Sequence, residues 1–178
     1  MGKVTIGLAK LEVAPLASDG GPGTTFVQIG FTSKGTFQFQ EEDPTKKTVD
    51  VEEKTDPLKV FKKAGARSLV FSLADPDTEA LALVRGGEIT TVASTTTVKG
   101  TKTYEEDAAV SYECTIRVTP EEGFKTIVYN HVSLSGKLNG GLGAEQELLL
   151  EIACDILTPS KAGVKTAVIV EELPLAEA

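Results

Sequence analysis

Apolar and polar residues alternate along two stretches of the chain in the manner of half-buried β-strands. Residues 110–118 carry an apolar side chain at every second position, and Pro120 follows this stretch. Residues 148–156 alternate in the same way before Pro159, but their second face is also partly apolar. A period of two predicts a β-strand for each stretch. The apolar second face indicates that the later strand is buried on both sides.

Seven further runs of strand length lie elsewhere in the chain, with turn-forming residues between them. We expect strands at residues 4–13, 25–31, 36–41, 47–53, 67–73, 88–93 and 125–135. Turn signals occur at residues 18–23, 43–44, 121–123 and 139–141. The β-branched residues Thr, Val and Ile make up 46 of the 178 residues, which also favours strands. These features predict a mainly β fold, a sandwich or barrel of antiparallel strands.

One short flanking α-helix is expected to interrupt this pattern at about residues 75–86. Asp75 is the expected N-cap, and Pro76 suits the first helical position because its φ is fixed. The pair Gly86-Gly87 provides a left-handed stop after a short apolar stripe. A weaker turn of helix is expected between residues 57 and 64.

The length of the chain predicts one domain, and its N-terminal residues do not match a signal peptide. We expect a single β-rich domain over residues 1–158 and a C-terminal extension over residues 159–178, with one apolar run at 167–170. Lys10 and Glu12 interrupt the N-terminal apolar residues before a signal peptide could form. No uncharged apolar run reaches the roughly 18 residues of a spanning helix, so no membrane association is expected.

The charge and composition exclude several kinds of partner and site. The net charge of −8 disfavours a sequence-reading nucleic-acid binder, because acidic surfaces repel phosphates. One histidine and two cysteines are too few for the usual zinc site. Cys114 and Cys154 are expected to be buried, free thiols in a reducing compartment. Aromatic residues make up only 6%, which is poor for stacking sugars or bases.

No motif for catalysis or cofactor binding emerges from the remaining candidates. His131 lies in a strand pattern without a nucleophile-elbow motif, and we interpret it as a solvated or hydrogen-bonded strand histidine. Residues 75–79 resemble the start of a calcium loop, but Ala80 replaces the loop glycine, and helix capping explains these acids. The Gly-rich residues 20–25 and 141–146 are interpreted as turns, since neither completes a phosphate-binding motif. We therefore expect no enzyme, no cofactor and no catalytic or metal-binding residue.

The charges are divided between two adjacent blocks. Residues 41–56 hold seven acids and three lysines, and residues 57–67 hold four bases and no acid. The blocks could be two arms of one hairpin that pair within the chain, or a solvated loop with incidental charges. Alternatively, a projecting acidic arm and a basic shelf meet on different subunits, because displaced complementary patches favour head-to-tail contacts.

The order of these parts resembles a known family. A charged excursion follows the strand with Phe37 and Phe39, and residues 67–77 (RSLVFSLADPD) then lead into the Leu-rich helix. The segment 125–139 (KTIVYNHVSLSGKLN) and the segment 147–159 complete the pattern. Over residues 25–159 the chain resembles phage major tail proteins, the tail-tube subunits of long-tailed phages and phage-like elements. Those proteins share a fold with the tube protein of type VI secretion.

The resemblance implies a structural virion protein of a phage or prophage, assembled in the cytoplasm of the host cell. It implies stacked homo-hexameric rings that form a tube, with strands joined around each ring into a continuous barrel. DNA would pass without sequence recognition, and other tail proteins would be partners. The loop between Glu41 and Asp56, with the lysines that follow it, would contact the adjacent ring. The expected contact residues are Glu41, Glu42, Asp43, Lys46, Lys47, Asp50, Glu52, Glu53, Lys59, Lys62 and Lys63.

Two other functions are compatible with the sequence. One is a different phage tail component, such as a terminator or connector, which need not polymerise. The other is a non-enzymatic β-sandwich that binds a small molecule or glycan, which would require a concave site with exposed aromatic residues.

Overall fold

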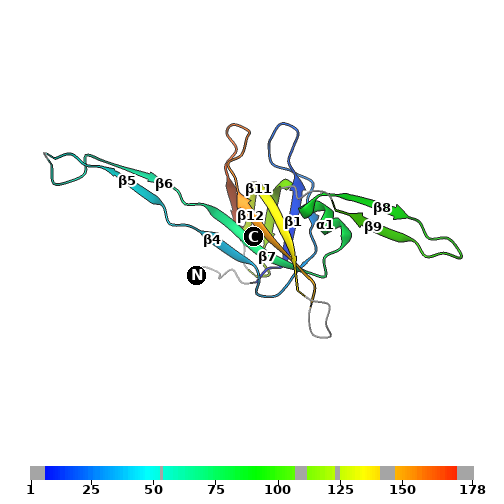
Figure 1. The fold of residues 1–178 in the computed structure, drawn as a ribbon. Helices are drawn as coiled ribbons and strands as arrows, with labels where there is room; N and C mark the ends of the chain where they lie inside the picture. Colours follow the sequence, from blue (N-terminus) through cyan, green and yellow to red (C-terminus); the bar gives the residue numbers. More distant parts are fainter. Residues whose placement is uncertain (1–6, 53, 107–111, 123–124, 141–146, 172–178) are drawn as a thin grey trace, which may run out of the picture.

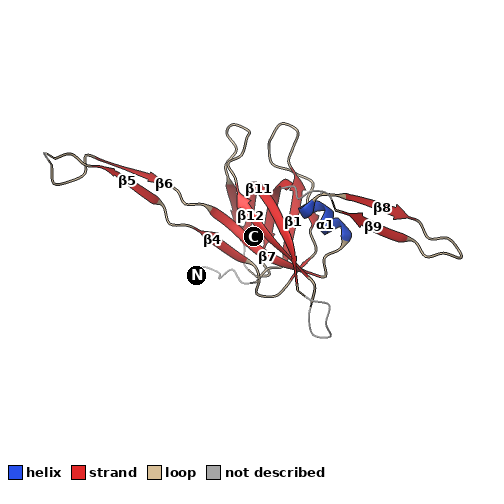
Figure 2. Ribbon diagram, in the orientation of Figure 1, coloured by secondary structure: helices blue, strands red, loops and turns tan. Residues whose placement is uncertain are grey.

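The computed structural model describes residues 7–52, 54–106, 112–122, 125–140 and 147–171. Nine described strands form one antiparallel sheet that curls into a half-barrel, and two separate hairpins project from it (Figure 1). The described part of the chain has one short helix, α1 (Thr78–Arg85), which lies against the sheet (Figure 2). The predicted mainly β fold of antiparallel strands with one flanking helix is confirmed.

The main sheet has the strand order β2-β1-β10-β11-β12-β7-β3, with β4 also paired to β7 and β13 to β11. Its strands are β1 (Lys10–Pro15), β2 (Val27–Gln28), β3 (Phe31–Thr32), β4 (Gln38–Glu41), β7 (Arg67–Ala74), β10 (Tyr112–Thr119), β11 (Lys125–Asn139), β12 (Leu149–Ile156) and β13 (Ala167–Glu171). The hairpins are β5 (Thr45–Val49) with β6 (Lys59–Lys63) and β8 (Glu88–Val92) with β9 (Thr101–Glu105).

The core lies between one face of the curled sheet and α1. Alternate residues of the central strands, among them Ile116, Leu134 and Ile152, are fully buried and form one cluster with Val84 of the helix. Cys114 and Cys154 belong to this cluster as free thiols, as the sequence predicted. The alternation seen in the sequence therefore corresponds to one apolar face turned to the core.

The start of α1 differs from the prediction. The N-cap is Asp77, whose carboxylate accepts a hydrogen bond from the Ala80 amide at 2.7 Å. Asp75, the predicted cap, has a positive φ of 49°, and its amide still donates to Leu148 O of the neighbouring chain segment at 3.3 Å. The chain thus remains attached to the sheet for one residue beyond β7, and the helix begins later. The predicted stop is confirmed, since Gly86 is the C-cap with φ 74°.

Two local predictions were wrong, and one strand was missed. The helical turn expected within residues 57–64 is instead strand β6, because pairing with β5 extends the chain there. The run at residues 25–31 divides into β2 and β3 around Gly30, which has φ 122°. Strand β9 was not predicted at all. Residues 4–6 and 110–111, which were expected to lie in strands, fall outside the described residues.

The segment expected to be a C-terminal extension contributes to the sheet. Its apolar run forms β13, which pairs with the N-terminal half of β11 while β12 pairs with the C-terminal half. The loop before β13 and the loop between β1 and β2 rise from the same end of the sheet (Figure 1). Lys161 and Asp19 join them through an ion pair of 2.6 Å. No helix within the described ranges is long and apolar enough to cross a membrane.

Candidate assembly surfaces

The two charge blocks of the sequence form one projecting hairpin. We call residues 42–66 the arm: β5 and β6 continue the direction of β4 and β7 away from the sheet (Figure 1). At its root the Glu42 amide donates to Ala66 O at 2.9 Å, and near its tip the Leu58 amide donates to Val49 O at 2.8 Å. All ten residues of β5 and β6 are exposed. Within the described part of the chain, no other element covers these two strands.

The charges alternate in sign along the arm. Acids lie at the root (Glu42 and Asp43), next to Glu41 at the end of β4, and again near the tip (Asp50, Glu52 and Asp56). The paired strands between them carry only lysines as charged residues, at positions 46, 47, 59, 62 and 63. The structure thus brings most of the predicted contact residues onto one hairpin, and Glu53 lies outside the described residues.

The lysines do not pair with the acids across the arm. The register places Lys46 opposite Lys62 and Lys47 opposite Phe61. Among the described residues, none of the five lysines in β5 and β6 forms an ion pair. The arm is thus one hairpin, but opposite charges do not match across its strands.

Apolar side chains accompany the lysines. Val60 and Phe61 of β6 are each about half exposed, at 48% and 49%, and Leu58 near the tip is exposed as well. The Lys59 ammonium lies 4.9 Å from the centre of the Phe61 ring, which is within the range of a cation–π contact. Exposed apolar residues on a projecting hairpin are typical of a surface that binds another protein.

The second hairpin, β8–β9, leaves the body on the opposite side (Figure 1). One of its faces is held against α1: the Tyr104 hydroxyl donates to Gly86 O at 2.8 Å, and Lys102 pairs with Glu79. Its other face is exposed and carries residues 88, 90, 92, 101, 103 and 105. The sequence predicted its first strand, at residues 88–93, but the second strand β9 was missed, although Thr101-Lys102-Thr103-Tyr104 alternates in polarity.

Strands β2 and β13 form two of the open edges of the main sheet; among the described strands, β3 and β4 also lie at an edge, since each pairs only with β7. Among the described strands, β2 pairs only with β1, and β13 pairs only with β11. Apolar side chains are exposed at both edges: Val27 of β2 is 63% exposed, and so is Ile169 of β13. Unpaired strand edges with apolar side chains readily accept a strand from another chain.

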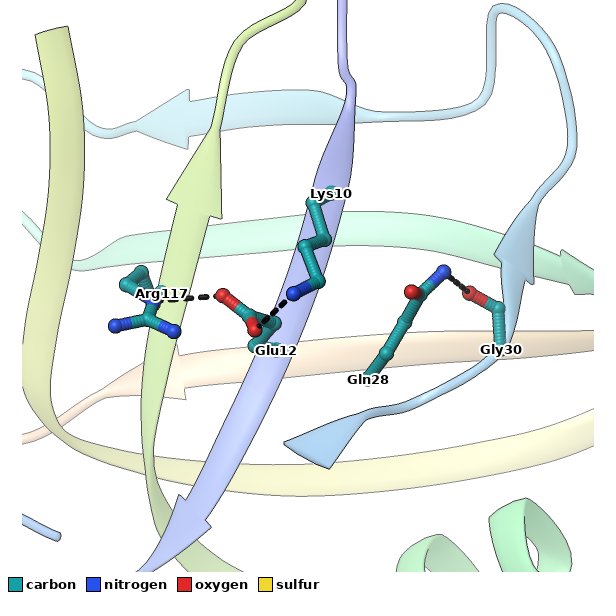
Figure 3. Close-up of polar contacts among 5 residues, drawn as sticks. All are labelled: Lys10, Glu12, Gln28, Gly30 and Arg117. Atoms are coloured by element: carbon teal, nitrogen blue, oxygen red, sulfur yellow. Dashed lines mark hydrogen bonds and ion pairs between the residues drawn. The ribbon is translucent and has the colours of Figure 1, made fainter. Parts of the chain in front are cut away.

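A partly buried cluster of ion pairs stabilises the sheet near β2. The Glu12 side chain is 5% exposed and accepts from Arg117 Nε and from Lys10 Nζ, each at 2.6 Å (Figure 3). Hydrogen bonding to Arg117, followed by that to Lys10, lowers the pKa of Glu12. Arg117 also lies over the ring of Phe26, 4.0 Å from its centre. Nearby, Gln28 donates to Gly30 O at 3.1 Å (Figure 3). This cluster links β1 to β10 and holds the segment that leads into β2 against them.

The titratable groups that enzymes commonly use have structural partners here. His131 is buried, with Nε2 3.0 Å from a Glu113 oxygen and Nδ1 3.1 Å from Thr158 O, as expected of a hydrogen-bonded strand histidine. Burial raises the pKa of the Cys114 thiol to about 12, so this thiol does not ionise at neutral pH. Within the described ranges, no group of His, Cys, Asp or Glu side chains is arranged to hold a metal ion.

Comparison with known proteins identifies a family that the chain matches. A family model described as phage tail tube protein matches residues 4–131, which is more than half of the chain. The match covers the arm, α1, the β8–β9 hairpin and the main sheet through the first part of β11. No curated protein matches the chain.

Proposed function

We propose that this chain, which belongs to the phage tail tube protein family, assembles into hexameric rings that stack into a tube through which DNA passes. Family membership makes the protein a structural, non-enzymatic tail component that assembles with itself and with other tail proteins. The observation that carries the finer proposal is the arm. An isolated two-stranded hairpin is marginally stable in water. An exposed hairpin with apolar residues therefore requires a partner, and the adjacent ring supplies it.

Ring formation is supported by the open edges of the sheet. The β2 edge and the β13 edge are different surfaces of one molecule, so a contact between them is heterologous. Heterologous contacts generate closed rings when the rotation between subunits closes. Pairing of these edges around a ring would complete the curled sheet and cover Val27 and Ile169.

The lumen of the tube is best supplied by the sheet face opposite the core. On this face Ser133 lies between Glu113 and Asp155, and Glu151 lies between Ser72 and Lys137. The face is polar, and each of the rings would add six times the chain's net charge of −8. An acidic, polar wall repels phosphates and lets DNA slide without adhering.

Electron microscopy of the purified protein at high concentration tests this function. Six-fold rings or tubes are the expected result. A protein that stays monomeric at every concentration and binds a glycan would contradict the proposal and favour a ligand-binding β-sandwich.

The contribution of the arm is tested by reversing three of its acidic charges together with that of Glu41 at the end of β4, in the variant E41K/E42K/E52K/E53K. We expect the variant to fold normally, because Glu41, Glu42 and Glu52 are exposed, but to stack poorly. The isosteric variant E41Q/E42Q/E52Q/E53Q separates loss of charge from charge repulsion and should show a smaller defect. Unchanged polymerisation of the well-folded reversed variant would refute the role of these residues.

A further inference from the structure

Each of the two projecting hairpins places like charges directly opposite each other, and the signs differ. On the arm, Lys46 lies opposite Lys62. On the second hairpin, Glu88 lies opposite Glu105. Directly opposed like charges destabilise a pair of antiparallel strands. Each hairpin is therefore destabilised locally, the arm by opposed positive charges and the second hairpin by opposed negative charges.

These four charges find no counter-ion within the described part of their own chain. Among the described residues, neither the two lysines nor the two glutamates form an ion pair. In contrast, two charged side chains next to these glutamates do have partners, because Lys102 pairs with Glu79 and Arg85 with Glu106. The unmatched carboxylates thus lie on the face of the hairpin that α1 does not cover.

The side chains beside the opposed charges on the arm are also similar in size and shape to those on the second hairpin. Lys46 and Lys62 share their face of the arm with Thr48 and Val60, since alternate residues of paired strands point the same way. On the second hairpin, the exposed face continues from the glutamates to further cross-strand pairs, Thr90–Thr103 and Val92–Thr101. Both faces are exposed ladders of small β-branched residues with charges at one end. Such flat faces can pack together as two layers.

The two hairpins cannot meet within one molecule because they project from opposite sides of the sheet (Figure 1). A contact between them must join two copies. Two different surfaces on opposite sides of one subunit form a heterologous contact that repeats from copy to copy.

We propose that the exposed face of β8–β9 is the docking site for the arm of a neighbouring copy, with Glu88 and Glu105 facing that copy's Lys46 and Lys62. The inference rests on the proposed function and adds to it the surface that receives the arm. Residues 48 and 60 of the arm then pack on the threonines and Val92 of the second hairpin.

Charge reversal on each side tests the contact. We expect E88K/E105K alone and K46E/K62E alone to fold normally and to raise the critical concentration for tube assembly by about tenfold or more, because each creates like-charge contacts. An equal mixture of the two variants should assemble again, since alternating copies restore opposite charges at every contact. The variant that combines all four substitutions should assemble as the original protein does.

The outcomes separate this inference from the proposed function. If the original protein forms rings or tubes but E88K/E105K assembles equally well, or if neither the mixture nor the combined variant recovers, the docking site is wrong while the tube function stands. If the original protein forms no rings or tubes, the function itself fails. As a direct measurement, oxidation of V60C copies mixed with T90C copies should give a disulfide-linked heterodimer. V60C copies mixed with S133C copies serve as the control and should not cross-link.

Discussion

Gly136 of β11 lies directly against Val84 of α1, so closely that a Cβ atom on this glycine would overlap with Cγ1 of the valine. Val84 is 1% exposed and is part of the core. The absence of a side chain at position 136 therefore lets the helix approach the sheet. The same helix carries the contacts to the β8–β9 hairpin, so this close approach also positions that hairpin.

The first prediction concerns this contact. Gly136→Ala should lower the free energy of unfolding by about 1–3 kcal/mol, because overpacking a core displaces its neighbours. Val84→Ala makes room for the added methyl group. The double variant should therefore be more stable than the sum of the two single effects predicts, as measured by urea unfolding. Additive effects would show that the overlap is relieved elsewhere.

The second prediction concerns the buried carboxylate of Glu12. Arg117→Ala should destabilise the protein by about 1–3 kcal/mol, because it leaves the Glu12 carboxylate with Lys10 as its remaining partner. Arg117→Lys keeps a positive charge but loses the planar guanidinium over Phe26, and it should cost less. The midpoint of urea unfolding at neutral pH measures both. Equal stability of the alanine variant and the original protein would contradict this account.

Glu12 also predicts a pH dependence. Its pKa is lowered in the folded protein from an ordinary value of 4.5. The stabilisation is therefore present above about pH 4.5 and is lost as the pH falls through the folded pKa. Glu12→Gln should be less stable than the original protein at pH 7, and this difference should shrink on acidification below pH 4.5. A constant difference across that range would be the contrary result.

The root of the arm offers a fourth prediction. A Cβ atom on Gly65 would overlap with the carbonyl oxygen of Glu42 across the two strands. Gly65→Ala should therefore disturb the arm and weaken assembly, while the melting temperature changes by no more than a few degrees because the arm lies outside the core. A large loss of global stability in Gly65→Ala would show that the arm and core unfold together.

The two thiols give the fifth prediction. Burial raises the pKa of Cys114 to about 12 and also raises that of Cys154. At pH 8 a thiol reagent should label neither residue in the native protein and both after denaturation in urea. Rapid labelling of the native protein would show that the core opens locally.

Burial accounts for the parts of the fold that could be predicted from sequence. In β10 and β12 every second residue enters the core, so the sequence of these strands has an apolar residue at every second position. The end of α1 was also predictable, because Gly86 satisfies a local backbone requirement. The start of α1 was not, since the attachment of Asp75 to the neighbouring segment, which displaces the cap to Asp77, is a contact distant in sequence.

The arm shows the opposite case. Its strands are exposed on both faces, so no burial pattern distinguishes residues 59–63 from a turn of helix. The acidic and basic blocks were visible as charges, but their arrangement depends on the register between β5 and β6. That register places lysine opposite lysine rather than opposite acid.

The antiparallel β-rich core, the stop of the helix and the presence of a charged excursion follow from the sequence, because each depends on side-chain periodicity or on local backbone chemistry. That the excursion is one hairpin, that a second hairpin leaves the opposite side, and that β13 joins the sheet is visible only in the folded chain. These features depend on strand pairing between distant segments, in which register and direction determine which charges and edges remain open.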